Sequence, residues 1–192
     1  GSCNNTTYTP NADFLQSYGG LAGLQQAAKD MDSVDLRIFK GSDLRCRIAF
    51  GQFLFDCCDS NGILNKLVSC NAEEEALAAQ RSPVDKSVLV GEYCSSRISL
   101  GLGSVCVQRK QTYCVYGSLL ARIIQKQGRP QIGLNFGAPE SPDCTGFTVD
   151  QFATLDFNRI DFTEFTSQFA MPAGDVQKIV NSFQQKISQG SN

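Results

Sequence analysis

Apolar positions in the first quarter of the chain predict one helix followed by two strands. Between residues 14 and 31 the apolar side chains recur at helical spacing. The period then becomes two over residues 34–38 and again over 44–48, where apolar and polar residues alternate. The intervening Lys40–Asp43 segment has turn chemistry, so the pattern predicts a β-hairpin over residues 34–48. Its polar positions include three arginines, which we expect on a solvated strand face, with a small patch for an anion or a partner as the alternative: Arg37, Arg45 and Arg47.

Two capping boxes predict the starts of further helices. Asn71 and Glu74 form the first, and the run of glutamates there suits the positive end of a helix that reaches about residue 80. Thr148 and Gln151 form the second, which opens a short helix ending near Leu155. Because helix electrostatics explains the run of glutamates, we assign no catalytic carboxylate pair to it.

Amphipathic stripes predict two more helices, over residues 119–128 and 176–187. The second contains only Lys178 and Lys186 as basic residues, too few to favour a membrane surface. We expect it to dock on the core, with contact to a partner as the alternative. β-Branched and aromatic residues between residues 88 and 116 predict short strands. Together these elements predict an α+β fold, a mixed domain of short β-strands or hairpins and several short helices.

The composition excludes several common classes of function. Among 192 residues there are 17 Lys+Arg and 19 Asp+Glu, a formal net charge of −2 that lacks the basic excess of nucleic-acid-binding proteins. The chain contains no histidine, which excludes Ser-His-Asp and Cys-His nucleophiles and His-ligated zinc. Gly101-Leu102-Gly103 is too short for a dinucleotide fingerprint. The pattern therefore reveals no active site, and we expect no cofactor.

Cysteine usage predicts a fold cross-linked by disulfides. There are nine cysteines, and none shows the Cys-x-x-Cys spacing of zinc knuckles and redox motifs. Cys57 and Cys58 are adjacent and would pair with each other only under strain, so we expect different partners for them. The even scatter indicates an extracytoplasmic protein, with a reduced cytosolic protein as the alternative. We expect disulfides, of open connectivity, among Cys46, Cys57, Cys58, Cys70, Cys94, Cys106, Cys114 and Cys144.

An odd number of cysteines leaves at least one thiol unpaired or paired outside the chain. Cys3 is the best candidate, because it lies beside the polar run Asn4–Thr7 in a terminal segment.

Acidic residues near the C-terminal end raise the alternative of a calcium site. Leu155-Asp156-Phe157 is repeated five residues later as Ile160-Asp161-Phe162, and Arg159 is the only basic residue among the acids of residues 140–164. No spacing here matches a known calcium loop, so we assign no metal site.

Ordered motifs along most of the chain resemble the TraN family, the mating-pair stabilisation proteins of F-type conjugative type IV secretion systems. The resemblance covers residues 36–165. Its motifs are, in order, LRIFKGSDLRCR, DCCDSNG, CNAEEEALA, GEYCS, KQTYC, SLLARIIQKQGRPQIGLNFG, PDCTGFT and LDFNRIDFTEF.

The resemblance implies a non-enzymatic structural or adhesion module. TraN proteins are cysteine-rich, associate with the outer membrane and stabilise contact between donor and recipient cells, and this chain resembles their C-terminal base region. That region implies protein partners in the outer-membrane secretion machinery, such as a TraV-type component. A recipient outer-membrane receptor would be recognised by a tip region that is missing here. The implied location is the outer membrane, periplasm or cell surface. Val115 departs from the family, whose members tend to have a second vicinal cysteine pair there, so disulfide pairings cannot be transferred whole.

The resemblance also suggests three parts of the chain. These are an N-terminal polar segment and helix (1–35), a TraN-like cysteine-rich core domain (36–165) and a C-terminal amphipathic helix (166–192). Two alternative functions stay open. A periplasmic thiol-active protein would use a reactive cysteine such as Cys70, directly before the expected helix start, and a cysteine-rich metal-binding domain would bind zinc.

Overall fold

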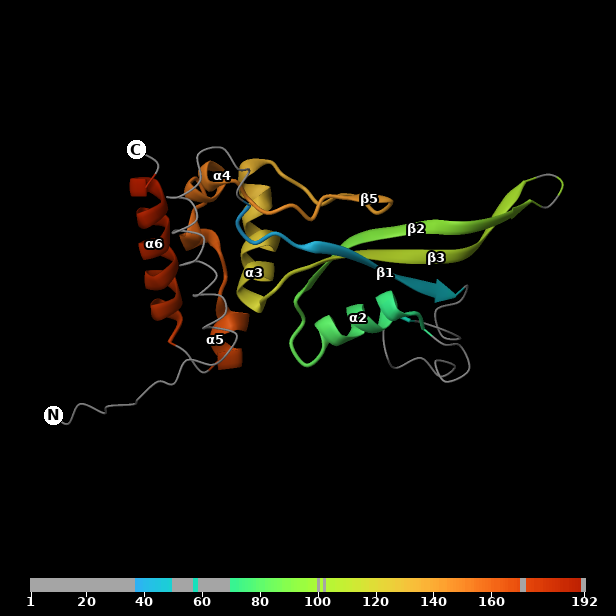
Figure 1. Cartoon of the computed structure of the whole chain (residues 1–192), viewed down its shortest axis with the longest axis horizontal. Coiled ribbons are helices and arrows are strands. Elements are labelled where there is room, and N and C mark those ends of the chain that lie inside the picture. The colour runs from blue at the N-terminus through green and yellow to red at the C-terminus, as the bar shows by residue number, and fades with distance from the viewer. Residues whose placement is uncertain are drawn as a thin grey trace.

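The molecule is elongated, with most of its helices gathered at one end, one helix beside the sheet in the middle and a long β-hairpin projecting at the other end (Figure 1). The structure is a computed structural model that describes residues 37–49, 57–58, 70–99, 101, 103–169 and 172–190. In these ranges no helix combines the length and the apolar character needed to cross a membrane. The described elements are β1 (Ser42–Ala49), α2 (Ala72–Arg81), β2 (Ser87–Ser99), β3 (Ser104–Val115), α3 (Leu119–Gly128), η1 (Arg129–Ile132), β4 (Gly137–Ala138), β5 (Ser141–Pro142), α4 (Val149–Ala153), η2 (Phe157–Arg159), α5 (Thr163–Phe169) and α6 (Ala173–Gly190).

An antiparallel sheet in the order β1-β3-β2 forms the middle of the molecule. β1 pairs with β3 only as far as Gln108, which lies opposite Ala49. β2 pairs with β3 to the far ends of both strands. The β2–β3 hairpin therefore continues beyond the end of β1 (Figure 1). We call the described residues of this continuation, 95–99, 101 and 103–107, the arm.

Two long strands occupy the region where short strands are expected. β2 has 13 residues and β3 has 12. Register shifts at Leu89/Gly91 and between Cys94 and Arg97 interrupt the pairing, which explains why the sequence pattern suggests shorter pieces. At Gly91 the β4–β5 hairpin packs so closely on β2 that a Cβ atom would lie 2.6 Å from Cγ of Pro139.

The prediction of a β-hairpin over residues 34–48 is wrong for residues 37–48, the part that the structure describes. Ile38 forms a β-bridge with Phe147, and β1 pairs with β3 instead. The backbone N–H of Gly41 donates to the carbonyl oxygen of Cys144 at 2.9 Å, so this segment still lies beside the chain around Phe147, and β1 begins at the next residue. Turn-forming residue types at this point hence do not reverse the chain.

The largest apolar cluster lies between the helices. Its buried side chains come from the bridge segment and from α3 through α6: Ile38, Leu119, Leu120, Ile123, Ile124, Phe147, Phe152, Leu155, Phe157, Ile160, Phe162, Phe165, Val176 and Val180. The side-chain amide of Gln184 on α6 also donates to the carbonyl oxygens of Ala153 and Leu155 at 2.6 and 2.8 Å. The C-terminal helix therefore docks on the core, as expected.

Local helix signals are confirmed where the structure describes them. Asn71 and Thr148 cap α2 and α4, each within a complete capping box. α3 ends at Gly128. The helix expected over residues 14–31 lies outside the described residues. The α+β class with disulfide cross-links is confirmed.

Two glutamine side chains form hydrogen bonds with the backbone of the repeated Leu-Asp-Phe and Ile-Asp-Phe units. The side-chain amide of Gln127 donates to the carbonyl oxygen of Asp161 and accepts from its N–H, at 2.9 and 2.8 Å. Gln131 forms the same pair with Asp156, at 3.2 and 2.9 Å. The phenylalanine after each aspartate is buried. Each aspartate carboxylate accepts from the N–H two residues later, so these acids cap local turns.

Replacing Gln127 with alanine should lower the free energy of unfolding by about 1–2 kcal/mol, because it removes two solvent-accessible hydrogen bonds. Lys126→Ala, on the exposed side of the same helix, is the matched control and should change it by less than about 0.5 kcal/mol. Urea denaturation measures both values. Equal losses in the two variants would contradict a role for the glutamine pair.

Candidate functional site: the β1–α2 junction and the arm

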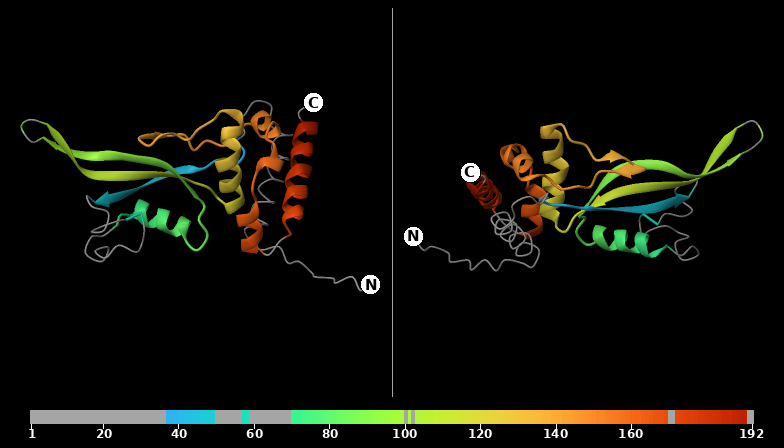
Figure 2. Two further views of the ribbon diagram at one scale, coloured as in Figure 1. Left: turned by 180° about the vertical axis from the view of Figure 1, so that it is seen from behind. Right: turned by 45° about the horizontal axis from the view of Figure 1, so that its top comes forward.

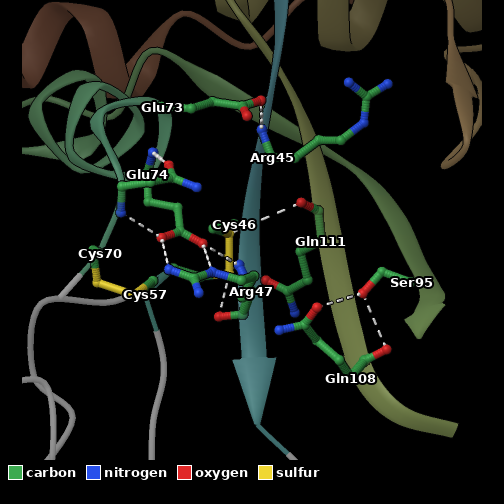
Figure 3. Close-up of polar contacts among 12 residues, drawn as sticks. Arg45, Cys46, Arg47, Cys57, Cys70, Glu73, Glu74, Ser95, Gln108 and Gln111 are labelled. Carbon is green, nitrogen blue, oxygen red and sulfur yellow. Dashed lines mark hydrogen bonds and ion pairs between the residues drawn. A yellow bond between two sulfur atoms is a disulfide. The ribbon is translucent and has the colours of Figure 1, made fainter. Parts of the chain in front are cut away.

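Carboxylates from α2 cover the outer edge of β1 (Figure 3). Glu73 accepts a hydrogen bond from the backbone N–H of Arg45 at 2.8 Å, and Glu74 accepts one from that of Arg47 at 3.0 Å. The two donors are alternate residues of one strand, so both point to the same edge. An uncovered edge would offer these groups to other chains, and the α2 carboxylates prevent that.

Glu74 is the central residue of this junction, with 1% of its surface exposed. Nε and Nη2 of Arg47 donate to its two carboxylate oxygens, both at 2.7 Å, and the N–H of Asn71 donates to it at 2.8 Å (Figure 3). Burial raises the pKa of the Glu74 carboxyl, but the hydrogen bonds from Arg47 and Asn71 outweigh burial and hold that pKa below its ordinary value. The ionised pair thus joins strand and helix.

The solvated arginine face predicted for this strand is wrong. The Arg47 side chain is 25% exposed and pairs with Glu74. Arg45 forms an ion pair with Asp43 at 2.7 Å, and Nη1 of Arg37 donates to a backbone carbonyl oxygen at 3.5 Å. The strand pattern alone does not show that an acidic helix 27 residues later returns to this edge.

Two disulfides fix the same junction. Cys58 pairs with Cys46 on β1, and Cys57 pairs with Cys70 directly before α2 (Figure 3). The adjacent cysteines therefore reach different partners. The N–H of Cys57 also donates to the carbonyl oxygen of Arg47 at 3.1 Å, on the edge that the α2 carboxylates cover.

The other two disulfides lie at the two ends of β3. Cys94–Cys106 crosses the base of the arm, and Cys114–Cys144 joins the sheet to the segment that enters the helical end. These four bonds together use the eight cysteines between residues 46 and 144. Cys3 lies outside the described residues, and its free thiol stays a prediction.

The thiol-active and metal-binding alternatives meet at one cluster. The sulfur atoms of Cys57 and Cys70 and a carboxylate oxygen of Glu74 lie within 4.8 Å of one another. The sulfurs are bonded to each other, so neither is a thiolate that could attack a substrate or bind a metal. The Glu74 oxygens already accept from Arg47 and Asn71. In this oxidised state the cluster is a cross-link.

The sequence pattern does not single out a buried arginine at the helical end. Arg129 is 1% exposed and forms an ion pair with Asp143 at 2.8 Å. It also donates to the carbonyl oxygens of Asn135 and Thr145, at 3.0 and 2.7 Å. No local pattern marks it, because its partners come from a loop 6 to 16 residues later.

Exposed apolar side chains gather on the arm. Ile98, Val105 and Val107 are 47%, 44% and 38% exposed, and Ile98 lies directly opposite Val105. Leu89, at 51%, is the other large apolar residue of the described ranges that is exposed, and it lies in the sheet away from the arm. Arg97 is the one charged residue of the arm.

Replacing Glu74 with glutamine should destabilise the fold by about 3 kcal/mol, because it leaves the Arg47 guanidinium without its anionic partner. Glu75→Gln removes the same charge from an exposed neighbour and should cost less than about 0.5 kcal/mol. Thermal and urea unfolding measure the difference. Similar losses for the two variants would show that helix electrostatics, and not the ion pair, sets the effect.

The pH dependence of stability should follow from the same carboxyl. Its pKa is lower in the folded than in the unfolded chain, so the stability it contributes is present above the ordinary value of 4.5 and lost as the pH falls through the folded pKa. Urea unfolding of the unaltered chain between neutral and acidic pH should show this loss, and the Glu74→Gln variant should lack that part of the slope. Parallel curves for the two proteins would contradict the assignment.

Comparison with known proteins places the chain in a family. The family described as "F-type Type IV secretion system, TraN" matches residues 1–148. The chain is 38% identical over 171 residues to the mating pair stabilization protein TraN of Escherichia coli (strain K12), a match that covers 86% of this chain but 27% of that relative. No solved structure matches. The resemblance seen in the ordered motifs is thus confirmed, and the chain belongs to the TraN family of F-type type IV secretion systems.

Proposed function

We propose that this chain is a non-enzymatic structural module that stabilises mating pairs in bacterial conjugation and docks on the outer-membrane machinery of its secretion system. The family match is the observation that carries this proposal. The relative from Escherichia coli bears the name mating pair stabilization protein, and the present chain spans 27% of its length. We therefore assign this chain a part of that role.

Cross-linking supports an extracytoplasmic location. Four disulfides within about a hundred residues form and persist in oxidising compartments such as the bacterial periplasm and the cell surface. We propose that the chain is associated with the outer membrane, in the periplasm or at the cell surface.

The polar residues at the best-formed sites already have structural partners. Glu74 is bound by Arg47, Arg129 is bound by Asp143, and Cys70 is bonded to Cys57. These contacts favour a scaffold over the thiol-active or metal-binding alternatives. With no histidine in the chain, the common nucleophilic mechanisms also lack their base.

We propose protein partners for this module. Its docking partner is an outer-membrane secretion component of TraV type, while recognition of a recipient outer-membrane receptor belongs to a tip region outside this chain. The near-neutral net charge of −2 gives no support for a nucleic-acid partner.

The docking proposal predicts direct binding. The chain, produced in the oxidising periplasm, should bind the purified TraV-type component of the same conjugative system with a Kd of about micromolar or tighter. The matched control is the same chain after reduction and alkylation, which should lose binding as the scaffold unfolds. Biolayer interferometry measures both. An oxidised, folded chain that does not bind would contradict the docking proposal.

A further inference from the structure

We infer that the arm, residues 95–99, 101 and 103–107, is the surface through which the chain docks, and that it fits an apolar groove rimmed by acidic residues on a protein partner. This inference rests on the proposed function, since it names the surface that makes the proposed contact. Four features of the arm carry it: exposed apolar side chains, unpaired strand edges, local positive charge and a rigid base.

The apolar side chains are concentrated where the hairpin leaves the body of the molecule. Of the four large apolar residues exposed in the described ranges, Ile98, Val105 and Val107 all lie on the arm. The sequence from Ile98 to Val107 contains no charged residue. Both views of Figure 2 show the hairpin reaching away from the helices, so no described element covers this end. A cluster of this kind marks a surface for another molecule.

The arm also leaves its backbone edges open. β1 stops opposite Gln108, and β2 is an edge strand of the described sheet. Outside the β2–β3 ladder, no backbone hydrogen bond within the described residues reaches positions 95–107. Nearer the helices, by contrast, carboxylates cover the edge of β1 and Pro139 packs on β2. The free edges can accept or donate hydrogen bonds to a partner strand.

The positive charge of the arm and its base favours a partner groove with acidic residues at its rim. From Tyr93 to Pro139 the sequence contains no aspartate or glutamate. Arg97 lies exposed beside Ile98, and Arg109 and Lys110 follow at the base of the arm. Arg109 is balanced by Glu92 at 2.8 Å, so among the described residues of the arm and its base Arg97 and Lys110 supply the net positive charge. Acidic residues around an apolar groove would complement it.

The base of the arm is fixed before binding. The Cys94–Cys106 disulfide crosses the two strands there, and the hydroxyl of Ser95 donates to the backbone and side-chain oxygens of Gln108, both at 3.2 Å (Figure 3). An isolated two-stranded hairpin is marginal in water, so these links keep the arm extended. A preformed arm loses less conformational entropy when it docks.

A lipid bilayer fits the same surface less well. Residues 95–107 contain no tryptophan, tyrosine or phenylalanine, and Arg97 is their single basic residue. Membrane-surface segments are usually rich in both classes. Open strand edges would also lose their hydrogen bonds to water in hydrocarbon without finding new partners. A protein groove can supply those partners.

The test compares substitutions of exposed apolar residues by serine on the arm and away from it. In the Ile98→Ser/Val105→Ser double variant, affinity for the purified TraV-type component should fall at least about tenfold. Leu89→Ser, at the exposed apolar residue away from the arm, should bind within about twofold of the unaltered chain. Arg97→Glu should weaken binding and make it less sensitive to salt. Thermal unfolding and disulfide mapping of each variant confirm that the fold is kept.

The outcomes separate this inference from the proposed function. If the unaltered chain binds and the double variant binds equally well, the arm is not the docking surface, while the proposed docking stands. If the unaltered chain does not bind at all, the docking proposal and the inference both fail. Binding of the unaltered chain to phosphatidylglycerol vesicles, lost in the double variant while protein binding is kept, would assign the arm to lipid and overturn the inference. Formation of dimers that depend on Ile98 would assign it to a second copy and overturn it as well.

Discussion

Disulfide bonds hold this elongated chain together because its apolar side chains are divided among three separate clusters. A cluster as small as the one beneath α2 excludes little surface from water, and each disulfide adds about 2–4 kcal/mol by restricting the unfolded chain. Two of the bonds join the β1–α2 junction, one crosses the base of the arm and one joins the sheet to the helical end. Within the described ranges, the β1–α2 junction, the arm and the helical end therefore each have a covalent brace.

Buried polar interactions stabilise the same parts of the fold that the disulfides cross-link. Glu74 satisfies the start of α2, the edge of β1 and the guanidinium of Arg47 at once. At the other end Arg129 organises the loop around Asp143. Both are buried charges whose stability depends on complete pairing. Disulfides and buried ion pairs brace both ends of the sheet, and the exposed large apolar residues of the described ranges lie mainly on the arm that extends beyond.

Local signals predicted local structure well. The capping boxes at Asn71 and Thr148 act over three residues, and both helices begin where they indicate. Contacts between distant segments could not be predicted from such local signals. The pairing of β1 with β3, and the return of Glu74 to Arg47, depend on segments tens of residues apart that no periodicity connects. Eight cysteines allow many pairings, and the adjacent Cys57 and Cys58 excluded only their own bond. The family was accessible from ordered motifs, whereas the exposed arm required the strand register.

Disulfide mapping of the unreduced protein tests the central claim, a scaffold braced at four defined places. The chain is folded in an oxidising compartment, alkylated under denaturing conditions, digested and analysed by mass spectrometry. We expect linked peptides for Cys46–Cys58, Cys57–Cys70, Cys94–Cys106 and Cys114–Cys144, with a single alkylated cysteine at Cys3. Exchanged partners for Cys57 and Cys58, or free thiols at Cys94 and Cys106, would contradict it.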